Sequence, residues 1–162
     1  MAYTVMSSAQ ATAREYGKSS LAAIVACLEA NAAVIVAGTR AVSASTIYAG
    51  RRAEPVYPCL MVEPLLHNED DMTMGGIGGG TRRLSLTYRV YGFDLAEGQP
   101  ETGTTQIVQL ADRVRAALVY NRTLDGTVLD VQVGRATFGR LSGSFAQGFQ
   151  MDVLVDREVS YP

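Results

Sequence analysis

The chain has 162 residues with 14 basic and 16 acidic side chains, so its net charge is −2. This length fits one domain with a sizeable core, and the charge balance excludes the overall basic character of many nucleic-acid-binding proteins. The longest apolar stretch, residues 21–37, is interrupted by Glu29 and Asn31, which argues against a membrane span.

Two features bear on where the protein is made. Residues 1–13 have neither the basic start nor the apolar core of a secretory signal. Cys27 and Cys59 each sit within an apolar run, as buried free thiols do, and two cysteines in a chain of this length do not suggest a disulfide framework. We therefore expect synthesis in a reducing, cytoplasmic compartment.

The N-terminal segment predicts an arm followed by a helix. Residues 1–18 are rich in Ala, Ser and Thr and are expected to form a short helix or a mobile arm. Ser19 or Ser20 can cap a helix that begins at Leu21, carries one apolar face and ends near Asn31.

Strand signals come next. The β-branched run 34–36 predicts a short strand, and residues 39–52 predict an irregular segment. Residues 59–62 are apolar at successive positions, which indicates a strand covered on both faces or a short edge strand covered by a helix. Pro64 is expected to end this strand, and residues 65–81 are expected to form a long flexible hairpin loop.

That loop is the most unusual segment, because it combines an acidic group with five glycines. Glycine raises the conformational freedom of a loop, and exposed loops often carry binding residues. We therefore expect the loop to be an interaction surface. Its candidate residues are Glu69, Asp70, Asp71, Gly76, Ile77 and Gly78.

The glycines do not form a nucleotide-binding motif. A dinucleotide fingerprint would need glycine where Thr81 or Arg83 stands, no P-loop lysine follows, and the segment precedes a strand rather than a helix. His67, the single histidine, could join the acidic group at a divalent ion, but the acidic residues lack the spacing of a calcium loop. A solvated acidic loop without metal or cofactor is expected.

The second half of the chain has the stronger patterns. Residues 82–93 alternate between apolar and polar side chains, as in a strand with one buried face. Residues 105–118 show the i, i+3, i+4, i+7 spacing of an amphipathic helix. Residues 129–133 alternate again and predict another strand, and residues 139–148 predict a turn or loop.

The closing segment, residues 149–161, has the clearest pattern. Its odd positions are apolar and its even positions polar, apart from Leu154 and Arg157, which predicts a long strand with one acidic, polar face. We expect Asp152, Asp156 and Glu158 to lie on a solvated or partner-facing surface.

Together these elements predict one α+β domain over residues 19–162, preceded by the arm of residues 1–18. Two helices should pack on one face of a mainly antiparallel sheet of four to five strands. No catalytic residues are predicted. Asp152 and Asp156 stand roughly 13 Å apart along a strand, too far for a glycosidase pair, and no serine has a nucleophile elbow around it.

The order of elements resembles that of bacteriophage tail terminator proteins, the family that includes the lambda tail terminator. The resemblance covers residues 20–162, and the arm of residues 1–18 is extra to the usual pattern. The matching features are the capped helix 20–31, the proline-led strand 57–63, the flexible loop, the alternating strand 83–91, the amphipathic helix 105–118 and the closing strand 150–161.

The resemblance implies a structural virion protein of the tail or neck, assembled in the host cytoplasm. It implies a hexameric ring that caps the finished tail tube, ends tube polymerisation and offers the head-attachment surface. The implied partners are further copies of the chain, the tail tube protein and a head–tail connector or neck protein. The resemblance further implies that DNA passes through the lumen without specific binding and that no membrane is involved. Asp152, Asp156 and Glu158 then line or rim the lumen, or lie on the ring's exterior.

Two other interpretations stay open. One is another neck, head–tail connector or head completion protein. The other, from a different class, is a small enzyme or ligand-binding domain, because an α+β fold does not determine function. The mass of the protein in solution distinguishes a ring-forming subunit from a monomeric enzyme.

Overall fold

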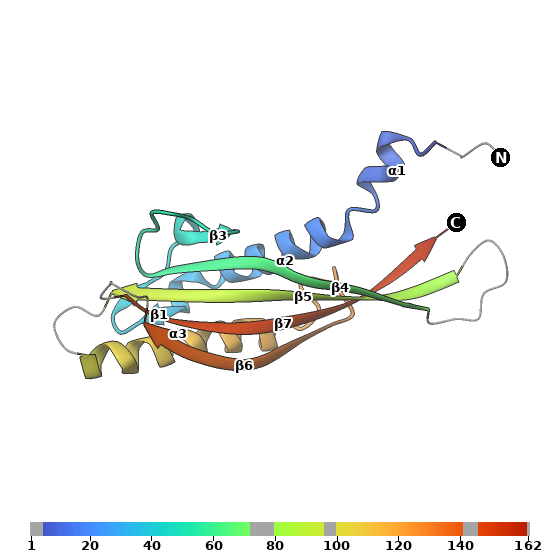
Figure 1. Ribbon diagram of the computed structural model, residues 1–162. Helices are drawn as coiled ribbons and strands as arrows, with labels where there is room; N and C mark the ends of the chain where they lie inside the picture. The colour runs from blue at the N-terminus through green and yellow to red at the C-terminus, as the bar shows by residue number, and fades with distance from the viewer. Residues whose placement is uncertain (1–4, 72–79, 96–99, 141–145, 162) are drawn as a thin grey trace.

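The computed structural model describes residues 5–71, 80–95, 100–140 and 146–161 (Figure 1). In chain order the elements are α1 (Ser8–Thr12), α2 (Tyr16–Ala30), the 3₁₀ helix η1 (Ala32–Val34), β1 (Val36–Ala37), β2 (Arg40–Ala41), the 3₁₀ helix η2 (Ala44–Thr46), β3 (Ile47–Ala49), β4 (Cys59–Asp71), β5 (Gly80–Leu95), α3 (Pro100–Tyr120), β6 (Asp130–Arg140) and β7 (Ala146–Tyr161).

Within the described residues, five strands form one sheet in the order β3-β4-β5-β7-β6. β3 runs parallel to β4, and every other neighbouring pair is antiparallel. β1 and β2 form a separate antiparallel hairpin. The predicted α+β fold with a mainly antiparallel sheet is therefore confirmed.

The core lies between this sheet and the helices α2 and α3, which pack on one face of it (Figure 1). The helical spacing seen in the sequence places one stripe of each helix inward. On the sheet, the even-numbered residues of β5 and the odd-numbered residues of β7 face the same core. The largest buried side chains include Ile24 and Leu28 of α2, Leu110, Val114 and Leu118 of α3, Leu86, Tyr88 and Val90 of β5, and Met151 of β7.

α2 begins at Tyr16 rather than at Leu21, so the predicted start is wrong. Ser19 and Ser20, expected to be caps, lie inside the helix, and Ser20 is buried. Arg157 of β7 donates hydrogen bonds to the Tyr16 carbonyl at 3.5 Å and to Ser20 Oγ at 3.2 Å. A side chain of the sheet thus holds the first turn, which local capping rules cannot anticipate. The predicted division between arm and domain falls within this helix.

A glycine in the same turn brings α2 close to the sheet. The Tyr88 hydroxyl donates to the Gly17 carbonyl at 2.7 Å, and the His67 ring fills the space where a Cβ of Gly17 would stand. Burial raises the pKa of Tyr88 to about 12, so its hydroxyl keeps the proton that it donates here.

β4 passes through Pro64 and continues to Asp71, so the predicted strand end at Pro64 is wrong. The pairing of β4 with β5 shifts register between Pro64 and Leu66. A bulge of this kind tolerates proline, because the residue there need not donate a ladder hydrogen bond. The predicted loop 65–81 is consequently shorter, since residues 65–71 and 80–81 belong to strands.

Other boundaries also extend beyond the predictions. α3 begins at Pro100 rather than near Thr105, because proline fits the first turn of a helix, where its missing N–H has no partner to lose. β6 and β7 extend into the predicted loop 139–148, up to Arg140 and from Ala146. The predicted strand 34–36 contributes only Val36 to a strand.

Substitution of Leu110 by alanine should destabilise the fold by about 2–5 kcal/mol, because it leaves a cavity between α3 and the sheet. Leu110 is fully buried. The free energy of unfolding in urea measures the effect. Val108→Ala is the matched control, since Val108 is an exposed residue of the same helix. If both variants lost the same free energy of unfolding, the result would contradict the packing of α3 on the sheet.

Candidate interaction surface

The second face of the sheet is the helix-free face, defined here by the odd-numbered residues of β5 and the even-numbered residues of β7. The antiparallel register sets these residues opposite one another. The surface contains Arg83, Ser85, Thr87, Arg89, Tyr91 and Phe93 of β5 and Gln150, Asp152, Leu154, Asp156 and Glu158 of β7. It holds all three acidic residues predicted on the closing strand.

Asp152 lies directly opposite Arg89, and the two form a bidentate ion pair. Arg89 Nε donates to Asp152 Oδ1 at 2.7 Å, and Arg89 Nη2 donates to Oδ2 at 3.2 Å. The hydrogen bond to Asp152 raises the pKa of Arg89 above its ordinary value. The Asp152 side chain keeps 44% of its surface exposed.

Asp156 is buried, with 3% exposed, so the expectation that it lies on an exposed face is wrong. It pairs with Arg83 and accepts a hydrogen bond from Ser85 Oγ at 2.8 Å. Both partners come from β5, and a buried carboxylate needs such donors. Alternation along β7 gives the face on which Asp156 lies but not what covers it.

Glu158 is exposed and lies opposite Arg83 in the register.

The acidic residues predicted in the loop lie in a strand instead. Glu69, Asp70 and Asp71 belong to β4, where the backbone pairs with residues 82–84 of β5. The other loop candidates, Gly76, Ile77 and Gly78, lie outside the described residues.

Two more ion pairs lie at the flanks of the helix-free face. Arg51 Nε donates to Glu63 Oε1 at 2.8 Å, and Arg122 Nε donates to Asp130 Oδ1 at 2.8 Å. Hydrogen bonds from Arg122 hold the pKa of Asp130 below its usual value. The face therefore carries paired charges rather than the acidic surface that the closing strand alone suggested.

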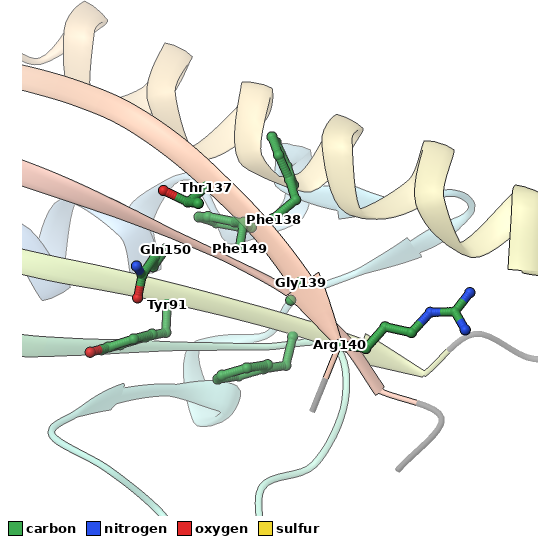
Figure 2. Close-up of a pocket in the computed structure, with 9 residues that line it drawn as sticks. Tyr91, Thr137, Phe138, Gly139, Arg140, Phe149 and Gln150 are labelled. Carbon is green, nitrogen blue, oxygen red and sulfur yellow. The ribbon is translucent and has the colours of Figure 1, made fainter. Parts of the chain in front are cut away.

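An aromatic cavity of about 300 Å³ opens near the end of this sheet where β6 stops and β7 begins (Figure 2). Tyr91, Phe93, Phe138 and Phe149 line it, and Phe138 is 47% exposed. Figure 2 shows Phe138 and Phe149 close together, whereas Arg140 points away from the other labelled side chains. Sequence reasoning missed this cavity.

Glycines lie opposite two of these aromatic residues. Gly92 lies opposite Phe149, and Gly148 lies opposite Phe93. A Cβ on Gly92 would overlap the Phe149 ring, and a Cβ on Gly148 would overlap the Phe93 ring. Each ring thus lies over a glycine of the neighbouring strand. The repeated Gly-Phe pairs, Gly92-Phe93 and Gly148-Phe149, are the sequence signal that could have revealed this packing.

The described residues offer no group of three or more His, Cys, Asp or Glu side chains able to hold a metal ion. Burial raises the pKa of the Cys59 thiol to about 12 and raises the pKa of the Cys27 thiol, so both are protonated near neutral pH. Among the described helices, none has the length and apolar character needed to cross a membrane.

Comparison with known protein-family models and with curated proteins finds no match. A solved structure gives a match in fold. The chain is similar to one in the structure "Virion of native gene transfer agent (GTA) particle", with a TM-score of 0.52 and 16% sequence identity. The similarity covers 86% of this chain and 94% of that one. The shared feature is the fold, over nearly the whole of both chains.

Arg83 and Arg89 of β5, which pair with the two aspartates, should contribute unequally to stability. Arg83→Gln leaves the buried Asp156 without its cation and should cost about 1–3 kcal/mol. Arg89→Gln leaves the half-exposed Asp152 without its cation and should lower the free energy of unfolding by about 0.2–1 kcal/mol. Urea unfolding measures both.

Adding Asp156→Asn to Arg83→Gln should recover part of the loss, because a neutral amide needs no cation. If Arg89→Gln is as destabilising as Arg83→Gln, the difference in burial between the two carboxylates does not govern stability.

Proposed function

We propose that the protein is a structural subunit of a phage-like virion and that it forms a hexameric ring at the end of the tail tube. In this role it ends tube polymerisation and provides the surface to which the head attaches. The observation that carries the proposal is the fold likeness to a chain of a gene transfer agent virion, which extends over 94% of that chain. The element order that resembles tail terminators supports the same role.

The edges of the sheet support assembly into a ring. Within the described residues, β6 forms one edge of the five-stranded sheet, and β3 covers only residues 60–62 of β4 on the other side. Such edges pair with other chains unless they are protected. Identical head-to-tail contacts between copies close into a ring and leave no free edge in the assembly.

The helix-free face suits a surface past which DNA moves. Its arginines are paired with Asp152 and Asp156, so it presents neither a strong basic attraction nor a strong acidic repulsion to phosphates. We propose that this face lines or rims the lumen. The end of β4 with Glu69, Asp70 and Asp71, together with Gly76, Ile77 and Gly78, would then contact the tail tube protein or a neck protein. The role requires no catalysis, metal or cofactor.

Electron microscopy and native mass measurement test the ring. The purified protein should form rings of six copies, and these should bind the ends of tubes assembled from the tube protein of the same particle. Tubes grown with the protein should stop elongating. A protein that stays monomeric at high concentration and leaves tube growth unchanged would contradict the proposal. Rings that bind a head connector but never a tube end would favour a connector role.

Charge reversal tests the lumen assignment. Asp152→Lys combined with Glu158→Lys should leave rings intact but slow DNA ejection, and the slowing should fade as salt rises. Asp156 is avoided because a lysine would be buried there. Asp112→Lys, an exposed site on α3, is the control and should have no effect. Normal ejection by the double variant at every salt concentration would place the helix-free face elsewhere.

A further inference from the structure

A groove of about 770 Å³ lies between the C-terminal ends of α2 and α3, on the side of the molecule away from the helix-free face. The side chains that α2 contributes to it are small alanines, whereas those that α3 contributes, Val119 and Tyr120, are larger. Val119 is 48% exposed and Tyr120 is 91% exposed, which is unusual for apolar and aromatic side chains without a partner. Its apolar lining residues include Ala23, Ala26 and Ala30 of α2, Val119 and Tyr120 of α3, and Leu124 beyond α3, and its polar ones include Asn31, Asn121 and Thr123.

The groove has a negative electrostatic character. Both helices present their C-terminal ends here, and neither has a basic residue in its last turn to offset the partial negative charge of the helix end. Asp125, an exposed residue, is part of the lining, and the exposed Glu29 directly precedes the lining residue Ala30 in the chain. The one cation in the lining, Arg122, is engaged by Asp130 at 2.8 Å. The groove therefore favours a segment that carries positive charge and places a few apolar side chains against Val119, Tyr120 and the alanines of α2.

Residues 5–14, the described part of the N-terminal arm before Glu15, combine the apolar Val5 and Met6 with small and polar residues and one arginine. None of the residues of α1 is buried, and Val5 is 91% exposed. A capping box between Ser7 and Gln10 shapes the short helix locally. Arg14 is the only charged residue of residues 5–14, and its Nη1 donates to Met6 Sδ at 3.5 Å within the same segment. A five-residue helix without buried contacts has little stability of its own, so the arm gains by docking.

Within one chain, the arm and the groove lie at opposite ends of α2. The arm precedes the first turn of α2 and projects away from the sheet, whereas the groove lies at the last turn of α2 (Figure 1). A helix of this length spans about 22 Å. A second copy placed head to tail brings its arm to the groove, and this contact is heterologous, as the contacts of a ring are.

We propose that the groove between the ends of α2 and α3 receives the N-terminal arm of a second copy of this chain. Val5 and Met6 of the arm pack against the apolar walls, and Arg14 lies towards the helix ends and Glu29. This inference deepens the proposed function, because the repeated contact links neighbouring subunits of the ring.

The test uses two variants that each lack one half of the contact. The first lacks residues 1–13, which precede α2 and contribute no buried side chain among those described. The second is Ala26→Arg with Ala30→Arg, which fills the groove and reverses its charge at two exposed positions. Ala22→Arg is the matched control, since Ala22 is an exposed residue of the same helix outside the groove lining. Circular dichroism and thermal unfolding confirm that each variant is folded.

Sedimentation velocity then gives the assembly state of each protein alone and of the two variants mixed. Neither variant alone should form rings, whereas Ala22→Arg should assemble like the natural chain. An equimolar mixture should form a 1:1 dimer and nothing larger, because only one arm and one groove are complementary. Rings formed by the arm-deleted chain, or a mixture that stays monomeric, would overturn the inference.

The two proposals fail in different ways. If the natural chain forms hexameric rings that persist without the arm, the docking inference is wrong and the ring function stands. If the natural chain forms open arm-dependent chains that never cap a tube, the docking inference stands and the proposed function is wrong. Arm-dependent compaction without any change in mass would show that the arm docks on its own chain and would also overturn the inference.

Discussion

The uninterrupted register between β5 and β7 is the constraint on which the rest of the structure depends. The two strands pair from Gly80 with Tyr161 to Leu95 with Ala146 without a shift. Side chains alternate across a strand, so this single alignment decides which residues of both strands meet the helices. A slip of one residue would turn Val153 and Val155 to solvent and place Asp152 in the core.

The register organises both faces at once. On the helix face it assembles the apolar surface that α2 and α3 cover. On the helix-free face it aligns Arg89 with Asp152 and brings Arg83 to Asp156. Near the end of the ladder it also sets glycine against phenylalanine in two successive pairs. Core packing, ion pairing and the glycine–phenylalanine contacts are therefore consequences of one alignment rather than three separate features.

Sequence patterns predicted the parts of this structure that depend on local periodicity. The inward stripe of α3 and the alternation of β5 and β7 are confirmed. The errors fall where a distant residue intervenes. Arg157 holds the start of α2, a bulge lets β4 pass Pro64, and β5 covers Asp156. Periodicity gives the face of a side chain but not its partner across the sheet, so the ion pairs and the cavity could not be predicted.

The strand order has a consequence for how the chain is made. β7 follows the other strands in the sequence yet lies between β5 and β6. A ribosome releases β5 and β6 before the strand that joins them exists, so the emerging chain holds two unsatisfied edges around an empty position. The β5–β7 pairs are 51 to 81 residues apart, and such distant pairing is slow. Until β7 inserts, neither face of the sheet can form, so folding of the sheet waits for the last strand in the order to be synthesised.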